Sequence, residues 1–186
     1  MPSFDIHPAN SALVLIDMQE RFLPVIPAMA ADQGCGRNCR ILLEVASLLG
    51  IPTTITEQYP KGLGTTLPYL VQANATATLL EKMHFSCADD APLRAHLEGL
   101  GRRLVVLCGV ETHVCVLHTA ADLLARGTQV IVAADAVASR KDLHRDLALT
   151  ALRDLGALLV PTESIAMRWQ RVAGTPAFKA ISGLIK

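Results

Sequence analysis

The sequence has no excess of charge of either sign. Lysine and arginine together number 17, aspartate and glutamate also number 17, and the formal net charge at pH 7 is zero. A protein that binds nucleic acid through phosphate contacts needs a basic surplus or a basic stripe. The composition therefore argues against a general nucleic-acid-binding function. A chain with so little net charge also favours self-association.

Long hydrophobic runs are absent as well. No stretch reaches the roughly 18 apolar residues that a membrane-spanning helix needs. The apolar run Ala12–Ile16 is too short for the core of a signal peptide. We therefore expect a soluble, cytoplasmic protein with no membrane partner. With 186 residues, the chain is expected to form a single domain over residues 1–186 with a sizeable core.

The five cysteines are an odd number at irregular spacing, which argues against a disulfide framework. Free thiols in a reducing compartment are the simpler interpretation. Cys35 and Cys39 lie four residues apart on a predicted helix and could form half of a metal site, but no second half is evident. Cys108 lies inside an apolar run and is interpreted as a buried core residue.

Short apolar runs alternate with longer helical patterns. Several of the runs are continuously apolar, which is typical of strands covered on both faces in a parallel sheet. We predict six strands, at Ala12–Ile16, Ile51–Thr56, Thr76–Leu80, Leu104–Cys108, Gln129–Ala133 and Ala157–Val160.

Helical spacing of apolar residues appears between these runs. It predicts helices over Gly36–Leu49, Pro92–Leu100, Val114–Ala125 and Asp142–Leu155, most of them followed by glycine as a stop signal. The last residues, Ser164–Lys186, are expected to form one or two covering helices or an arm onto a neighbouring subunit. The βα alternation predicts an α/β fold with three α/β/α layers around a six-stranded, mainly parallel sheet.

Chemically capable residues follow three of the predicted strands. Asp17 follows the first, Lys82 the third, and Cys115 comes soon after the fourth, at the start of a helix. Ligands of open α/β sheets bind beyond the carboxyl ends of the strands. A carboxylate, an ammonium and a thiol at that edge form a candidate active site. Each residue also has a structural alternative. Asp17 could be a turn residue, Lys82 a solvated surface residue, and Cys115 a small buried hydrophobic residue.

Cys115 is the candidate nucleophile. The N-terminal end of a helix and a nearby ammonium both stabilise a thiolate, which lowers a cysteine pKa from about 8.5 to roughly 3.5–7.5. His113 and His118 flank Cys115, so a Cys–His dyad is a rival mechanism. His118 lies one helical turn beyond Cys115 and could share its face.

Three segments carry a resemblance to a known family. LVLIDMQERF (13–22), EKMHFS (81–86) and GVETHVCVLHTAADLLARGTQVIVAADAVASR (109–140) resemble, in order, the aspartate, lysine and cysteine motifs of the isochorismatase-like cysteine hydrolases. The match covers nearly the whole chain. The resemblance implies that Asp17, Lys82 and Cys115 form the catalytic triad.

The resemblance has further implications. It implies a cis peptide bond between Val110 and Glu111, and an oxyanion hole formed by the backbone N–H groups of Glu111 and Cys115. The segment TEQYPKGLG (56–64) contains no histidine where nicotinamidases of the family bind a metal, so no metal is expected. Isochorismatases proper lack the nucleophilic cysteine, so the presence of Cys115 argues against their reaction. Within the family, this chain most resembles a subgroup that binds no metal, the isochorismatase domain-containing hydrolases.

A cysteine-dependent hydrolase of a small-molecule amide or related acyl bond is therefore expected, acting through a thioester and without a cofactor. Family members are commonly oligomeric, so a homo-oligomer is expected too. Candidate substrate-binding side chains lie just beyond the strand ends. They are Gln19, Phe22, Tyr59 and Phe85. For Phe22 and Phe85, core packing is the alternative.

Other functions are open to a chain of this fold. The segment Gly62–Gly64 begins a G-x-G pattern, but Leu67 breaks the dinucleotide fingerprint, and no phosphate-binding loop is present. A catalytically silent small-molecule-binding or scaffold protein is the main alternative, because fold does not imply function. A redox-sensing role for Cys115 is a third possibility.

Overall fold

The structure, a computed structural model, describes residues 5–186. Residues 1–4 of the predicted domain lie outside the described residues. Six parallel strands form one sheet in the order β3-β2-β1-β4-β5-β6. The strands are β1 (Ser11–Ile16), β2 (Thr53–Gln58), β3 (Thr78–Lys82), β4 (Leu104–Val110), β5 (Gln129–Ala138) and β6 (Leu158–Val160).

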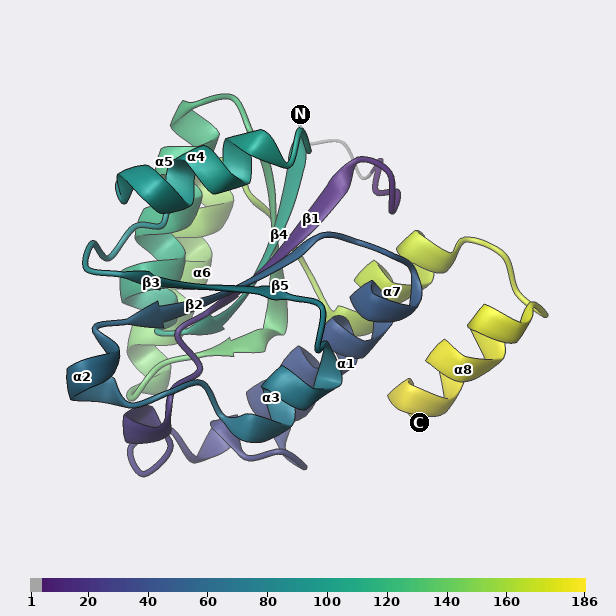
Figure 1. Cartoon of the computed structure of the whole chain (residues 1–186), viewed down its shortest axis with the longest axis horizontal. Helices are drawn as coiled ribbons and strands as arrows, with labels where there is room; N and C mark the ends of the chain where they lie inside the picture. The colour runs from purple at the N-terminus through teal and green to yellow at the C-terminus, as the bar shows by residue number, and fades with distance from the viewer. Residues whose placement is uncertain (1–4) are drawn as a thin grey trace.

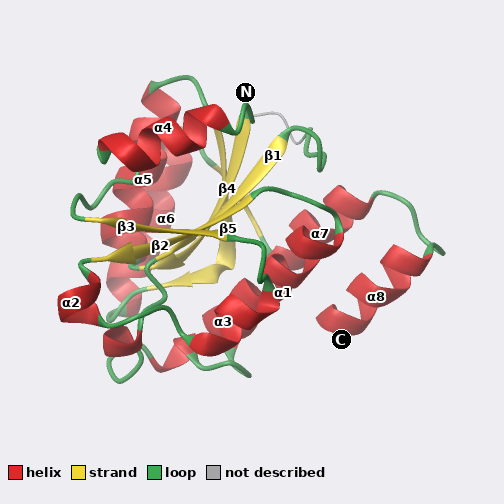
Figure 2. Cartoon of the chain, in the orientation of Figure 1, coloured by secondary structure: helices red, strands yellow, loops and turns green. Residues whose placement is uncertain are grey.

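Helices cover both faces of the sheet, which confirms the predicted three layers (Figures 1 and 2). One face carries α1 (Gly34–Leu48), α3 (Pro68–Ala73), α7 (Thr162–Gln170) and α8 (Pro176–Ile185). The other face carries α4 (Ala91–Gly99), α5 (Leu117–Ala125) and α6 (Asp142–Asp154). The short elements are α2 (Pro60–Leu63), two 3₁₀ turns at Glu20–Phe22 and Pro27–Met29, and a π-helical turn at Thr112–Val116.

Each face of the sheet has its own apolar core. Leu13, Leu15 and Val106 point to the α1 side, where Trp169 of α7 also lies buried. Val14, Ile16 and other alternate residues point to the α5 side. This alternation follows from the two-residue period of a strand. The continuous apolar runs therefore arise because both faces of the sheet are buried.

The C-terminal residues form two helices that pack on their own chain, as one of the sequence alternatives predicted. Arg37 of α1 donates from Nη2 to the carbonyl oxygens of Leu184 and Ile185, at 3.3 and 2.8 Å. No helix among residues 5–186 combines the length and apolarity needed to cross a membrane.

Several strands extend further than the sequence predicts. Lys82 is the last residue of β3 rather than the residue after it, and β4 includes Gly109 and Val110. Gly109 has φ +109°, and a Cβ there would lie 2.1 Å from the carbonyl oxygen of Ile16. Glycine is needed here because β1 and β4 approach closely where the strand order reverses. That reversal point is where ligands bind in sheets of this kind.

Candidate active site

Asp17 leaves the end of β1 in an unusual backbone conformation. Its φ is +50°, in the left-handed region that non-glycine residues seldom occupy. Its N–H donates to the carbonyl oxygen of Thr56 at 3.1 Å. The Thr56 hydroxyl donates to Asp17 Oδ1 at 2.7 Å. Such outliers cluster at functional sites because the surrounding fold holds them in place.

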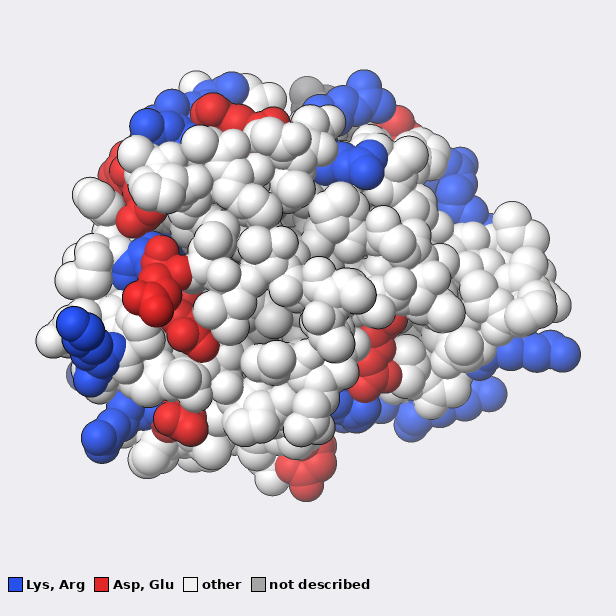
Figure 3. All heavy atoms as spheres, viewed as in Figure 1, with Lys and Arg blue, Asp and Glu red and all other residues white. Residues whose placement is uncertain are grey.

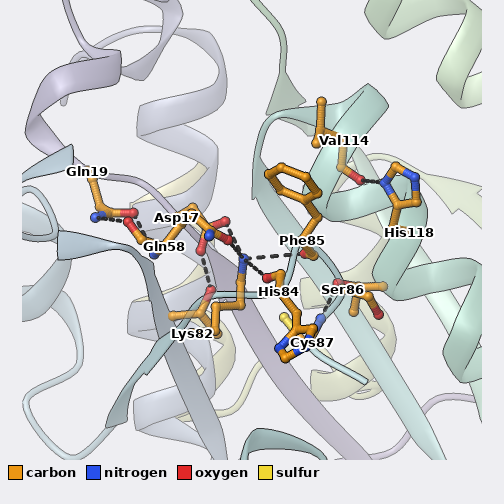
Figure 4. Close-up of polar contacts among 12 residues, drawn as sticks. Asp17, Gln19, Gln58, Lys82, His84, Phe85, Ser86, Cys87, Val114 and His118 are labelled. Atoms are coloured by element: carbon orange, nitrogen blue, oxygen red, sulfur yellow. Dashed lines mark hydrogen bonds and ion pairs between the residues drawn. The ribbon is translucent and has the colours of Figure 1, made fainter. Parts of the chain in front are cut away.

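Lys82 reaches Asp17 from β3, across the intervening strand β2. Its Nζ donates to Asp17 Oδ2 and to Gln58 Oε1, each at 2.7 Å (Figure 4). The carbonyl oxygens of His84 and Phe85 lie 3.3 Å from the same nitrogen. Neither the Lys82 nor the Asp17 side chain has any exposed surface. The two therefore form a fully buried ion pair, and oxygen atoms surround the ammonium.

Cys115 lies in the π-helical turn Thr112–Val116, just before α5. The sequence predicts an α-helical first turn here instead. The residue is only 6% exposed, and its thiol interacts electrostatically with the Asp17 carboxylate. The Asp17 carboxylate thus interacts with both the ammonium and the thiol. The structure brings together the three residues that the sequence places at three strand ends.

The electrostatics of Cys115 differ from the sequence-based expectation. Burial raises the pKa of the Cys115 thiol well above its usual value, and the negative charge of Asp17 raises it further. The Lys82 ammonium lowers that pKa, but by less. The expected low thiol pKa is therefore wrong for this structure. The resting residue is a neutral thiol, which needs a base before it can attack.

Asp17 is suited to act as that base. Burial raises the pKa of its carboxyl, although Lys82, Cys115 and Thr56 all stabilise the ionised form. Burial lowers the pKa of the Lys82 ammonium, but Asp17, Cys115 and Cys87 together outweigh burial and raise it. Within this pair, Lys82 therefore stays protonated, and the Asp17 carboxylate can still accept a proton.

The peptide bond between Val110 and Glu111 is cis, as the resemblance implies. The Glu111 carboxylate accepts hydrogen bonds from the backbone N–H of Arg140 at 2.9 Å and from Arg140 Nε at 3.0 Å. These bonds tie the segment after β4 to the segment after β5. They fix the loop that carries the predicted oxyanion donors, the backbone N–H groups of Glu111 and Cys115.

Gln19 is a buried positioning residue. Its Nε2 donates to the carbonyl oxygens of Gln58 at 3.1 Å and Gly64 at 2.7 Å, and its Oε1 accepts from the Gln58 N–H at 2.8 Å. Both amide hydrogens and the amide oxygen are thus engaged by the main chain. We assign Gln19 the role of holding Gln58, a ligand of the Lys82 ammonium, and not a direct contact with substrate.

The three aromatic candidates differ in exposure. Phe22 is half-buried and packs against the core on the α1 side, which agrees with the packing alternative. Tyr59 is 47% exposed and Phe85 is 59% exposed. Phe85 lines a cavity of about 400 Å³, which also borders Met83, His84, Ser86, Asp89, His118 and Asp122. This cavity lies beside the two carbonyl groups that contact Lys82.

His118 has a partner other than Cys115. Its Nδ1 lies 2.7 Å from the carbonyl oxygen of Val114, so that nitrogen must carry the proton (Figure 4). The Cys115 thiol interacts with Asp17 instead. This arrangement favours Asp17 over His118 as the base.

Three residues of the site were not identified from the sequence. Thr56 and Gln58 contact Asp17 and Lys82, and polar residues two apart on a buried strand were the available signal. Cys87 is fully buried, and its backbone N–H donates to the Thr119 hydroxyl at 2.9 Å. Burial raises the pKa of Cys87 to about 11. Nothing in the local sequence distinguishes Cys87 from a core cysteine.

No three His, Cys, Asp or Glu side chains within residues 5–186 gather in an arrangement that could hold a metal ion. The charged surface is also mixed in sign. On the face shown in Figure 3, basic and acidic side chains lie mainly around the rim, and no continuous basic stripe crosses it.

Comparison with known proteins identifies the family. A family model described as the isochorismatase domain matches residues 11–164. Isochorismatase domain-containing protein 2A of Mus musculus is 40% identical over 183 residues, which cover 97% of this chain and 85% of the mouse protein. The chain belongs to the isochorismatase domain family.

Two solved structures are similar to this isochorismatase domain. The MAR1 ribonuclease from Caenorhabditis elegans is 38% identical, with a TM-score of 0.87 over 97% of this chain and 91% of that one. The YcaC gene product of Escherichia coli, an octameric hydrolase of unknown specificity, is 21% identical with a TM-score of 0.90. That match covers 99% of this chain and 92% of YcaC, and it shows the fold alone. The isochorismatase domain described here therefore has an isochorismatase-like hydrolase fold.

Proposed function

We propose that this protein is a cysteine hydrolase that cleaves an amide or related acyl bond of a small molecule through a thioester. One observation carries the proposal: the buried Asp17 carboxylate forms an ion pair with the Lys82 ammonium and interacts with the Cys115 thiol. A carboxylate held between a cation and a thiol can accept the thiol proton and later return it.

The first half of the reaction forms the thioester. Asp17 takes the Cys115 proton as the sulfur attacks the acyl carbon, and the carbonyl oxygen becomes an oxyanion. The backbone N–H groups of Glu111 and Cys115 hold that oxyanion, each contributing about 3 kcal/mol. The C–N bond then breaks, and the leaving amine takes the proton from Asp17. Lys82 keeps a positive charge beside the carboxylate throughout.

The second half regenerates the thiol. Asp17 removes a proton from a water molecule, which attacks the thioester carbon and forms a second oxyanion in the same place. The C–S bond breaks, the acid leaves, and the sulfur recovers its proton from Asp17. Asp17, Lys82 and Cys115 lie together before substrate binds, so proximity contributes to the rate.

The burial of the site supports a small substrate. Cys115 is only 6% exposed, so a slender acyl group can reach its sulfur more readily than a folded protein chain. The exposed rings of Tyr59 and Phe85 are the side chains that we propose grip it from outside, with Phe22 fixed in the packing beneath.

Trapping the acyl-enzyme tests this proposal. The protein would be incubated with a panel of small amides and activated acyl compounds, quenched in acid, and examined by peptide mass spectrometry. We expect an acyl mass increase on the peptide carrying Cys115 and none on those carrying Cys87 or Cys108. If no compound acylates Cys115 while the folded protein still binds members of the panel, the silent binding protein becomes the better description.

RNA cleavage is a second candidate, because a relative 38% identical to this chain is described as a ribonuclease. The balanced charge of the chain gives this candidate less support than the cysteine site gives the first. Single-stranded RNA treated with the wild-type protein and with Cys115→Ala separates the two. Cleavage that survives the substitution would establish a ribonuclease activity independent of the proposed hydrolase site.

We also propose that the protein self-associates in a reducing compartment such as the cytoplasm. The octameric state of the YcaC product and the neutral charge of this chain support self-association. Five buried, unpaired cysteines support the reducing compartment. Light scattering of the purified protein gives the subunit number directly.

A further inference from the structure

A second concave feature lies at the carboxyl edge of the sheet, and the proposed hydrolysis does not use it. It is a cavity of about 450 Å³ lined by Val25, His113, Arg140, Lys141 and His144. Four of these five side chains are basic. We call this feature the basic cavity.

The basic cavity occupies the part of the fold where α/β proteins bind ligands. Arg140 and Lys141 follow the carboxyl end of β5, and His113 follows that of β4 (Figure 1). His144 lies in the first turn of α6. Open α/β sheets bind their ligands in crevices outside these strand ends. The cavity shares the 111–115 loop with the candidate active site.

The acidic group nearest to Arg140 is already engaged. Glu111 is 5% exposed, and it accepts from the backbone N–H and Nε of Arg140. That geometry leaves Nη1 and Nη2 of the guanidinium for another partner. The Arg140 side chain is 58% exposed, so these two donors are accessible to an anion. A guanidinium held on one edge is well placed to bind a planar anion on the other.

The two histidines are held against each other. Their ring centroids are 4.8 Å apart with the planes tilted by 58°. His113 Nδ1 lies 3.0 Å from the Ser139 hydroxyl, which leaves Nε2 for a second contact. Burial lowers the pKa of His113, and the charges of His144 and Arg140 lower it further against the opposing effect of Glu111. The cavity therefore places the Arg140 guanidinium and the Lys141 ammonium beside two imidazole rings that can donate hydrogen bonds.

We infer that the basic cavity binds one oxyanion group, a phosphate or a carboxylate, through Arg140, Lys141, His113 and His144. Such a ligand supplies the acceptors that these nitrogen donors lack, through charge-assisted hydrogen bonds. The site goes beyond the proposed hydrolase function, because cysteine acylation needs no anion. The inference therefore does not rest on the role of Cys115.

Isothermal titration calorimetry with inorganic phosphate tests the inference, in a chloride-free buffer at neutral pH. Parallel titrations with acetate and with a short single-stranded oligoribonucleotide identify the source of the anion. The variants are Lys141→Gln and His144→Gln. Lys179→Gln, at an exposed lysine of α8, is the matched control, and Cys115→Ala keeps the test separate from catalysis.

We expect saturable binding of phosphate, of acetate, or of both, weakened about tenfold or more in Lys141→Gln and in His144→Gln. Binding should be unchanged in Lys179→Gln and in Cys115→Ala. Histidine NMR of the wild-type protein adds a readout that needs no substitution. The bound anion should raise the pKa of His113, whose other charged neighbours are Glu111, Arg140, Lys141 and His144.

Three results would overturn the inference. They are the absence of saturable binding of either small anion, an equal loss of affinity in Lys179→Gln, and binding of the oligoribonucleotide alone. Retained anion binding in a protein that never acylates at Cys115 would support the cavity and contradict the hydrolase. Acylation of Cys115 without anion binding would support the hydrolase and contradict the anion site. Each proposal can therefore fail without the other.

Discussion

The Lys82 ammonium lies 2.7 Å from the Asp17 carboxylate, and neither side chain has exposed surface. The two residues are 65 positions apart. Asp17 directly follows β1 and Lys82 ends β3, and these two strands are not neighbours in the sheet. The two charges of such an ion pair have lost their hydration. Removal of either charge would leave the other buried without a stabilising partner. This dependence, and the Cys115 thiol that shares the carboxylate, give the following predictions.

Removal of Lys82 alone should destabilise the fold. Lys82→Met leaves the Asp17 carboxylate buried without its cation, which should lower the free energy of unfolding by about 3–5 kcal/mol. Urea denaturation measures this loss. The double variant Asp17→Asn/Lys82→Met should lose less than the sum of the single variants, because it leaves no buried charge unpaired. Strict additivity would show that the pair is not coupled.

Substitutions of Asp17 and Lys82 should change the alkylation of Cys115 in opposite directions. Asp17 raises the pKa of the thiol and Lys82 lowers it. In Asp17→Asn the thiolate should form at lower pH, so iodoacetamide should label Cys115 faster at neutral pH. In Lys82→Ala labelling should be slower than in the wild type. Peptide mass spectrometry over a pH series measures each midpoint, with Cys35, Cys39 and Cys108 as internal controls.

The same chemistry predicts one variant in which Cys115 is alkylated faster but substrate is no longer hydrolysed. Asp17→Asn should have the more reactive thiol and yet lose hydrolysis, because the amide cannot accept or return the proton. Cys115→Ala should lose turnover by on the order of a thousandfold or more. Cys108→Ala, at a core thiol inside β4, should retain it. Full activity in Asp17→Asn would remove Asp17 from the mechanism.

The pH dependence of kcat/KM should report the base. Burial raises the pKa of Asp17 above its ordinary value of 3.8, and the reaction needs the ionised carboxylate. Activity should therefore be present at neutral pH and fall as the pH drops through that raised value. The acid-limb midpoint should lie above 3.8 and should disappear in Asp17→Asn if any residual rate is measurable. A limb unaltered in that variant would belong to another group.

Gly109→Ala should be severely destabilising. The new methyl group would lie 2.1 Å from the Ile16 carbonyl oxygen, at a φ of +109° that only glycine adopts readily. We expect a loss of more than about 3 kcal/mol, which exceeds most single substitutions. Gly183→Ala in α8 is the control, since a Cβ there meets nothing within 4 Å. Helix propensity should make the control neutral or slightly stabilising.

Much of the architecture could be predicted because both faces of the sheet are buried. The continuous apolar runs at Ala12–Ile16 and Leu104–Cys108 are confirmed as strands, and the sheet is parallel throughout. The strand ends were less predictable. Gln58 and Lys82 end strands although both are polar, because tertiary contacts bury them. The short helices α2 and α3 have too few residues for a periodic pattern to appear.

The candidate site shows the same limit. Asp17, Lys82 and Cys115 could be selected because they follow or end strands, and the structure brings them together. The direction of the Cys115 pKa could not be predicted. It depends on how deeply the loop is buried and on which oxygen faces the sulfur, and neither is encoded locally. The π-helical turn that carries Cys115 was not predicted for a related reason, since the pattern of its five residues is that of the first turn of an α-helix.

The strand order has a consequence for folding kinetics. The three residues of the site lie directly after β1, at the end of β3 and in the segment after β4, so bringing them together closes long loops of chain. Such closures are slow compared with the formation of a single helix. A refolding intermediate without β4 in place would leave Cys115 open to solvent and remote from Asp17. The time at which Cys115 becomes shielded from alkylation therefore marks the assembly of the central sheet during refolding, and recovery of activity cannot precede it.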